Sequence, residues 1–183
     1  MLEQLEQACG WTAKTVAGVG SADLTGPTPC AEWDLRTLLD HLVGGVEMFA
    51  TAIGGSLPED PSAPYLARYE RASGTLLASL AEPGAMERMA DLPIGAVPGS
   101  ALAGIALLDI AVHGWDVAAA TGQPTDLPEP VAAAALAGAR QSVGPQMRGP
   151  GGFFAESVAI DDDAPAVDRL VALLGRDPRW VRR

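Results

Sequence analysis

The sequence predicts an all-α protein: a helical bundle with extra C-terminal helices and one short irregular or hairpin insertion. Nearly half of the 183 residues are hydrophobic (48%), which suits a chain in which several helices each bury an apolar face. Apolar residues recur with helical spacing in several segments, and glycines and prolines separate these segments. The length fits a single domain over residues 1–183.

Three helices are expected in the first half of the chain. Apolar residues recur every three or four positions over residues 2–19, before a stretch that contains glycine and proline. Asp34 is a good N-cap for a second helix that ends near residue 53, at a pair of glycines. Pro64 suits the first turn of a third helix that ends near residue 80.

The chain changes character over residues 81–99, where prolines and glycines interrupt short apolar stretches and predict a loop or a poor hairpin. Ser100 is then expected to cap a fourth helix that continues through residue 121. This helix is apolar nearly all round, which predicts that it is buried.

Two further helices are predicted after it. One is alanine-rich and covers residues 130–143. The other follows the acidic triplet 161–163, which is expected to form its N-cap and first turn, and ends near residue 174. Negative charge at a helix start is a commoner role for such a triplet than metal binding.

Composition narrows the function. The formal net charge of −11 argues against nucleic acid and anionic membranes as partners, since both require clustered Lys and Arg. No uninterrupted apolar run reaches the roughly 18 residues that a transmembrane helix needs, and the first twenty residues do not resemble a signal peptide. Two cysteines, Cys9 and Cys30, are too few for a disulfide framework. We therefore expect a cytoplasmic protein in which both thiols act as small buried apolar groups.

The chain contains only two histidines, and one of them, His113, follows Asp109 by four residues in the predicted apolar helix. Residues four apart in an α-helix differ by about 40° around the axis, so both side chains project from one face and can bind one ion. A buried carboxylate without a partner is costly or becomes neutral, and a cation shared with His113 removes that cost. The spacing therefore indicates a metal site.

The other histidine, His41, lies in the second predicted helix, and Gly44 and Gly45 follow it. Glycines within a helix cost about 1 kcal/mol each and are tolerated where a neighbouring helix or a bound molecule needs room. This is consistent with a third ligand arriving from a facing helix. Two imidazoles and one carboxylate leave coordination positions open and suit zinc, non-haem iron or another divalent transition metal. The alternative is that the histidines are satisfied core residues.

Four stretches of the chain carry a family resemblance: residues 28–36, 38–45, 109–122 and 162–178. Over these stretches, in this order, the sequence resembles the actinobacterial metal-binding proteins of the DinB-like superfamily, close to the N-terminal domain of mycothiol-dependent maleylpyruvate isomerase. The resemblance implies a DinB-like four-helix bundle core that holds a divalent metal, commonly zinc or nickel.

Residue by residue, the resemblance places the metal ligands at His41, Asp109 and His113. Aspartate at position 109 departs from the isomerase, which has a glutamate there. The resemblance also implies mycothiol as a cofactor and a homodimer as the assembly. The partners are then a small-molecule thiol or an electrophile, and the reaction is thiol transfer or isomerisation. Catalytic and cofactor-binding residues are not identified by these motifs.

Two other functions are compatible with the sequence. One is a metal-binding bundle that binds a small molecule without catalysis, and the other is a helical dimerisation module in which the two histidines are coincidental. Beside the ligands, Asp116 is expected either to orient His113 or to pair with an arginine such as Arg36. Trp33 and Trp115 lie next to the metal-bearing segments, where core packing is favoured over lining a pocket.

Overall fold

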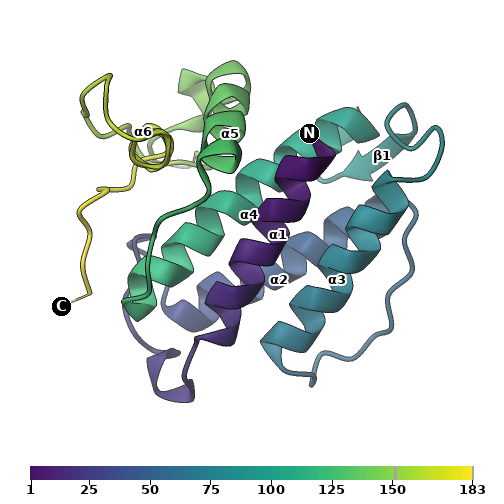
Figure 1. Cartoon of the computed structure of the whole chain (residues 1–183), viewed down its shortest axis with the longest axis horizontal. Helices are drawn as coiled ribbons and strands as arrows, with labels where there is room; N and C mark the ends of the chain where they lie inside the picture. The colour runs from purple at the N-terminus through teal and green to yellow at the C-terminus, as the bar shows by residue number, and fades with distance from the viewer. Residues whose placement is uncertain (151, 183) are drawn as a thin grey trace.

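The computed structural model describes residues 1–150 and 152–182, apart from the side chain of residue 22. Four helices form the core of the fold: α1 (Leu2–Ala17), α2 (Leu35–Ala52), α3 (Tyr65–Leu80) and α4 (Gly99–Thr121). Helices α1 and α2 each contact both α3 and α4, which closes the four into a bundle (Figure 1). The predicted all-α class and the four-helix core are confirmed.

The remaining elements are short and lie around this core. A 3-10 turn, η1 (Ser21–Asp23), follows α1, and strands β1 (Met89–Leu92) and β2 (Gly95–Pro98) form an antiparallel hairpin before α4. After the bundle come α5 (Glu129–Ser142), the 3-10 turn η2 (Pro145–Met147) and α6 (Ala166–Leu173). Helices α5 and α6 pack on each other beside the bundle, and α5 contacts α1 and α4 (Figure 1). The predicted hairpin and extra C-terminal helices are therefore present.

Helix α4 is central because it has neighbours on most of its sides. It packs against α1, α2, α5 and the hairpin, and its buried residues point in every direction around the axis. Within the described chain it is the one helix long and apolar enough to cross a membrane, and 72% of that apolar window is buried inside the protein. Its apolar character is thus explained by its place in the core.

Two predicted helix starts are wrong, one because of tertiary contacts and the other because of a local proline. Helix α4 begins at Gly99, so Ser100 lies inside its first turn. The N–H groups of Gly99 and Ser100 donate to the carbonyls of Arg88 (2.8 Å) and Met86 (2.9 Å). The loop before the hairpin therefore satisfies the free donors of the first turn, and no side-chain cap is required.

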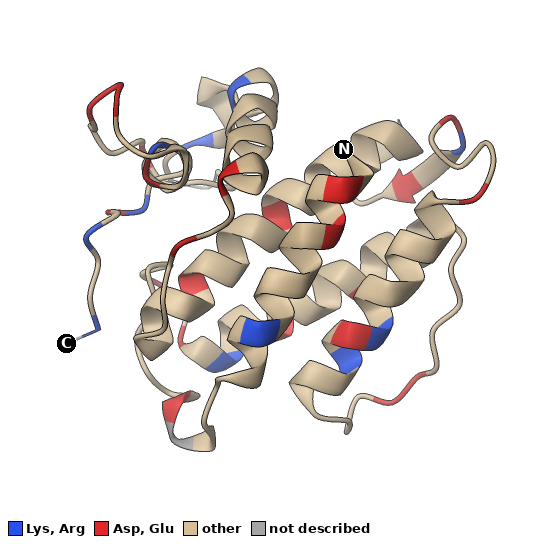
Figure 2. Ribbon diagram, viewed as in Figure 1, with Lys and Arg blue, Asp and Glu red and all other residues tan. Residues whose placement is uncertain are grey.

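The acidic triplet is the second correction. Helix α6 begins at Ala166 after Pro165, whose backbone is extended, and the N–H of Ala164 donates to the carbonyl of Asp161 at 3.2 Å. Residues 161–163 therefore form a separate turn. Because a residue before proline avoids the helical region, the helix cannot include Ala164. Acidic residues are otherwise scattered over helices and loops (Figure 2).

Close contact between α1 and α4 depends on Gly114. A Cβ at this position would lie 2.3 Å from Oγ1 of Thr12. Thr12 is fully buried, and its hydroxyl donates to the carbonyl of Ile110 at 3.2 Å. The threonine therefore has no free space into which to move.

We expect Gly114→Ala to destabilise the protein by about 1–3 kcal/mol through overpacking, although alanine is the better helix former. Gly104→Ala in the same helix is the matched control, because a Cβ there meets nothing within 4 Å and should stabilise by up to about 1 kcal/mol. Urea unfolding measures both changes. Equal effects at the two positions would contradict the close packing, and Thr12→Ala should reduce the loss in Gly114→Ala.

Candidate metal centre

The three residues predicted as metal ligands lie together between two helices. Helix α2 carries His41, and α4 carries Asp109 and His113. Nε2 of each histidine lies 3.6 Å from Oδ1 of Asp109, and the two imidazole rings are 4.7 Å apart, nearly perpendicular. One donor atom from each residue lies within 4.8 Å of the others. Residues distant in sequence are thus brought together as a set of three donors.

The second oxygen of Asp109 carries a further signal. Oδ2 is buried and accepts no hydrogen bond within the described part of the chain. Such an oxygen costs the full desolvation penalty of the group, and natural proteins rarely leave one. A cation bound by the carboxylate would offset this cost, and the nitrogen and oxygen donors around it fit a divalent transition metal.

Gly45 makes the room that this carboxylate occupies. A Cβ at position 45 would lie 3.2 Å from Oδ2 of Asp109, whereas a Cβ at Gly44 meets nothing within 4 Å. The expectation that the glycine pair provides space is therefore supported at Gly45 alone. The Asp109 side chain, which is shorter than a glutamate, thus places its carboxylate close to the backbone of α2.

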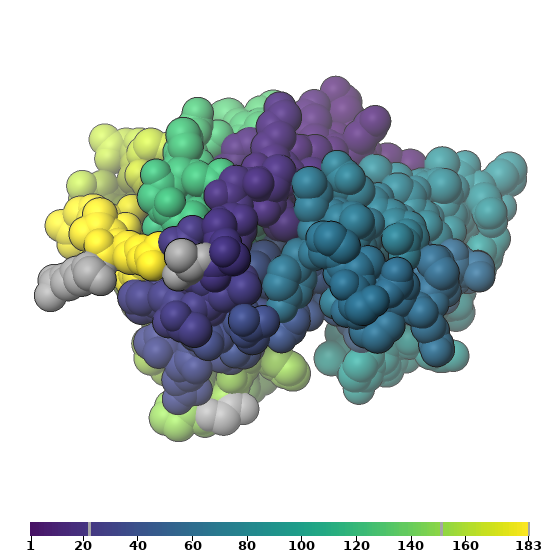
Figure 3. All heavy atoms as spheres, turned by 90° about the horizontal axis from the view of Figure 1, so that it is seen from below, coloured from purple at the N-terminus to yellow at the C-terminus, as the bar shows by residue number. Residues whose placement is uncertain are grey.

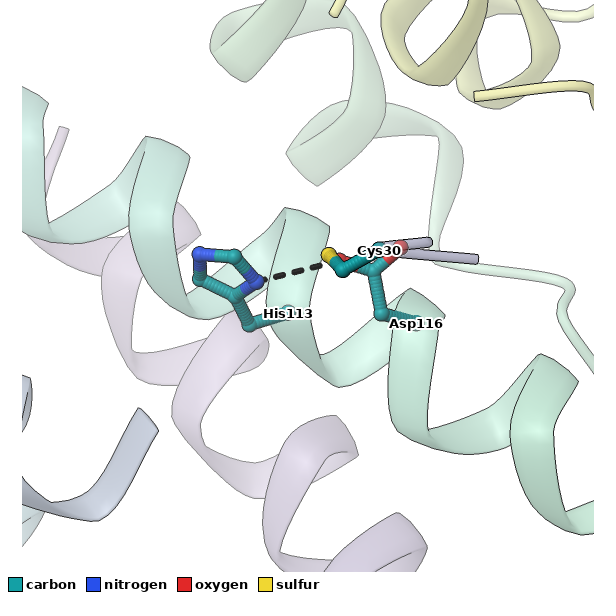
Figure 4. Close-up of side chains that lie close together, drawn as sticks. All are labelled: Cys30, His113 and Asp116. Atoms are coloured by element: carbon teal, nitrogen blue, oxygen red, sulfur yellow. Dashed lines mark hydrogen bonds and ion pairs between the residues drawn. The ribbon is translucent and has the colours of Figure 1, made fainter. Parts of the chain in front are cut away.

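The ring of His113 is held by Asp116. Nδ1 of His113 lies 3.0 Å from Oδ2 of Asp116, three residues on in α4, as the dashed line in Figure 4 marks. An ionised carboxylate only accepts, so Nδ1 carries the proton and donates. In the neutral ring the lone pair is then on Nε2, on the side of Asp109 and His41. This is the usual arrangement behind a histidine that ligates a metal.

Asp116 itself is fully buried and pairs with Arg176 from the segment after α6. The arginine donates through Nε to Oδ1 (3.2 Å) and through Nη2 to Oδ2 (2.9 Å), and its Nη1 donates to the carbonyl of Leu174 at 2.9 Å. Burial alone would raise the pKa of Asp116, but the nearby Arg176 and the hydrogen bond from His113 outweigh it and hold the pKa below its usual range.

The two roles considered for Asp116 therefore coexist, and the expected partner Arg36 is replaced by Arg176. The segment around Arg176 belonged to the tail stretch that carried the family resemblance, but no local pattern connects it to Asp116, which is sixty residues earlier. The signal that could have found it is the burial of Asp116, since a buried carboxylate requires a cation or donors.

Cys30 joins the same network. Its Sγ lies 3.2 Å from Oδ2 of Asp116 and 3.0 Å from Nη2 of Arg176, and Figure 4 shows the sulfur next to the carboxylate. Burial, with the nearby Asp116, raises the pKa of this thiol to about 12. The expectation of a small buried apolar group holds for Cys9 and is wrong for Cys30, whose thiol donates to a carboxylate.

Cys30, His113 and Asp116 also lie close enough to form a second set of metal donors. Arg176 already contacts both the sulfur and the carboxylate. A metal ion at this point would face a permanent positive charge. The arrangement therefore favours an ion on the Asp109 side of His113 and a hydrogen-bonded support on the other.

A cavity of about 810 Å³ opens beside the three donors. Its lining comes from the loop before α2, one face of α4, residues 149–150 and 152–156, and the segment after α6. The ring of Trp33 lies 4.7 Å from that of His41 and 5.9 Å from that of His113. Trp33 thus lines the cavity and also packs against the core, so both roles considered for it are present. Trp115 packs in the core near Ala119 and Val171.

The backbone near Cys30 is fixed by Thr28. Its hydroxyl donates to the carbonyl of Trp33 at 2.8 Å and accepts from the N–H of Cys30 at 3.1 Å. Arg182 pairs with Asp23, and the C-terminal tail lies beside the N-terminal part of the chain (Figure 3). These two residues do not line the cavity, to which the loop before α2 and the segment after α6 contribute.

Comparison with known proteins identifies the family. The family model described as "Mycothiol maleylpyruvate isomerase N-terminal domain" matches residues 5–118. Two uncharacterized proteins of Mycobacterium tuberculosis, from strains CDC 1551 / Oshkosh and ATCC 25618 / H37Rv, are each 41% identical over 169 residues, covering 91% of this chain and 92% of theirs.

The fold is also found in a crystal structure of a histidine-to-alanine mutant of the mycothiol-dependent maleylpyruvate isomerase. The TM-score is 0.57 at 15% sequence identity, over 74% of this chain and 66% of that one. This likeness concerns the fold, and the chain spans about two thirds of that structure's length. The family match and the relatives together show that the chain belongs to the mycothiol maleylpyruvate isomerase N-terminal domain family.

Proposed function

We propose that this chain binds one divalent metal through His41, Asp109 and His113 and activates a small thiol, mycothiol by family, for transfer to an electrophile or for isomerisation of one. The convergence of three donors carries the proposal: Oδ1 of Asp109 lies 3.6 Å from Nε2 of both His41 and His113. The buried Oδ2 of the same carboxylate accepts no hydrogen bond among the described residues, and a cation bound by the carboxylate would offset this uncompensated charge. Zinc and nickel both suit two nitrogens and one oxygen.

The residues around the donors support the same role. A divalent cation, when bound, lowers the pKa of a coordinating thiol and so favours the nucleophilic thiolate. Asp116 keeps the proton of His113 on Nδ1, and Arg176 keeps Asp116 charged. Trp33 packs beside both imidazoles at the edge of the cavity. The cavity then gives a small molecule access to the face of the site that the protein leaves open.

The reaction proposed is an addition. The thiolate sulfur forms a bond to an electron-poor carbon of the electrophile, and the displaced electron pair takes up the proton that the thiol lost. Reversal after rotation about the former double bond gives isomerisation, and retention of the sulfur gives transfer. Metal and small-molecule binding without turnover would instead identify a binding protein, the alternative function expected from the sequence.

We retain the single domain over residues 1–183 and the homodimer as proposals. None of the exposed large apolar side chains of the described residues lies on a helix, so a contact between copies would use loops or the hairpin. Met89 on β1 and Ile94 in the hairpin turn are 58% and 61% exposed. The hairpin therefore offers two exposed apolar side chains to a contact between copies.

Metal content is the first test. The protein purified without an affinity tag, loaded with zinc and desalted, should hold about one ion per chain by elemental analysis. His113→Ala and Asp109→Asn should lose it, because each removes one of three donors. Asp40→Asn is the matched control: this residue adjoins His41, but its carboxylate accepts from the hydroxyl of Tyr65. Wild-type protein that retains neither zinc nor nickel would refute the site.

The support behind His113 is tested with Asp116→Asn, which should weaken zinc binding by about 10–100-fold in competition with a chromophoric chelator. Arg176→Gln should cost about 3–5 kcal/mol of stability by leaving a buried charge without its cation, and the double variant should recover most of that loss. Arg179→Gln, at an exposed arginine of the same tail, should change neither quantity. Unaltered zinc affinity in Asp116→Asn would show that the carboxylate does not position the ligand.

Thiol binding is tested with cobalt in place of zinc. A small thiol added to the cobalt-loaded protein should produce charge-transfer absorption, because sulfur replaces oxygen among the ligands. Mycothiol should saturate this signal at lower concentration than glutathione, and protons should be released as thiolate forms. A spectrum that stays the same at saturating thiol would leave the site as a metal-binding pocket without sulfur chemistry.

A further inference from the structure

The charges around the cavity restrict what can bind beside the metal site. Four formally charged side chains line it among the described residues, apart from the histidines: Glu32, Asp109, Glu156 and Arg176. Three are carboxylates, and the single cation is the guanidinium that holds Asp116. The cavity is therefore short of positive charge before any ligand enters.

Arg176 is not free to bind an anionic ligand. Its Nε and Nη2 both donate to the Asp116 carboxylate, Nη2 also contacts the sulfur of Cys30, and Nη1 donates to the carbonyl of Leu174. Its side chain is 9% exposed and that of Asp116 is fully buried. Turning the guanidinium toward a ligand would leave Asp116 buried without its cation, at a cost that a single ligand carboxylate cannot repay.

No other described arginine or lysine replaces it. Arg148 lies on the loop that also carries Phe153, but it donates to the backbone carbonyls of Leu173 and Ala155 and does not line the cavity. Glu32 and Glu156 are exposed at the cavity, and the Glu156 carboxylate lies over Gly149, 3.0 Å from where a Cβ would stand. Both repel an anion that approaches from solvent.

The uncharged wall of the cavity is largely apolar. Helix α4 contributes three aliphatic side chains, the loop before α2 contributes an indole, and the loop after η2 contributes two phenyl rings: Ile105, Leu108, Val112, Trp33, Phe153 and Phe154. Phe153 is 74% exposed, which leaves its ring available to an incoming molecule. Aromatic and aliphatic walls bind uncharged apolar molecules by removing their surface from water.

From the charges and walls of this cavity we infer that the electrophile is an uncharged, apolar molecule and not a carboxylic acid. The inference deepens the proposed function and rests on it for the thiol. The two positive charges of a divalent ion are matched by Asp109 and one thiolate, so nothing in the site remains to neutralise a carboxylate on the second reactant. A dicarboxylate would bring two negative charges that no cation in the site neutralises.

The test compares two probes with the same carbon skeleton, methyl cinnamate and the cinnamate anion. Binding is followed through the indole N–H signal of Trp33 in two-dimensional ¹H–¹⁵N NMR, with zinc-loaded protein saturated with a small thiol. The ester should bind at least about tenfold more tightly than the anion, since a buried charge without a partner is costly. Equal affinities, a tighter anion, or absence of binding by the ester would overturn the inference.

The source of the selectivity is tested with Glu32→Gln/Glu156→Gln. This variant should bind cinnamate about three- to fivefold more tightly at low salt and leave the ester unchanged. Glu59→Gln/Glu129→Gln, at two exposed glutamates that do not line the cavity, should leave both affinities unchanged. An unchanged ratio in the first variant, or the same change in the second, would refute the role of the cavity carboxylates.

Measurements on metal-free protein distinguish the proposed thiol chemistry from the inference about ligand charge. Without an ion Asp109 adds its negative charge to the cavity, so the ester should again be preferred. If the protein binds no metal but retains this preference, the proposed thiol chemistry fails and the inference about ligand charge stands. If metal and thiol bind and the preference is absent, the proposed function stands and the inference fails.

Discussion

The buried carboxylate of Asp116 is the interaction on which the site depends. It accepts from His113 on its own helix, from Arg176 after α6 and from Cys30 in the loop before α2. Because an ionised carboxylate without partners is strongly destabilising in the interior, all three donors must be in place together. One side chain thus fixes the ring of a candidate ligand, the position of the tail and the wall of the cavity.

The fold was largely predictable because its information is local. Helical periodicity, the Asp34 cap, whose side chain accepts from the N–H of Thr37, and the glycines and prolines between segments locate most elements within a few residues. The all-round apolar character of α4 correctly predicts its burial. One error occurs where another segment satisfies the backbone: Ser100 is not needed as a cap, because Arg88 and Met86 supply acceptors to the first turn. The other error is local, because Pro165 keeps Ala164 out of helix α6.

The candidate site divides in the same way. Asp109 and His113 share a helix face by their spacing alone, and the structure places His41 opposite them. The roles of Arg176 and Cys30 could not be predicted from sequence spacing, because only tertiary packing brings these two residues to Asp116. The prediction that Gly44 and Gly45 provide space is supported in part. A Cβ would crowd a neighbouring side chain at Gly45 and not at Gly44.

Two aspartates seven residues apart on α4 differ in burial and in hydrogen-bond partners. This difference indicates on which side of His113 a cation would bind. Asp116 is fully buried and fully paired, so its charge is neutralised inside the protein. Asp109 is 20% exposed toward the cavity and keeps one oxygen without a donor. His113 stands between them and presents one ring nitrogen to each. A cation is therefore favoured on the side of Asp109, where negative charge is uncompensated, and the arginine that excludes it from the other side is the same group that cannot serve an anionic ligand.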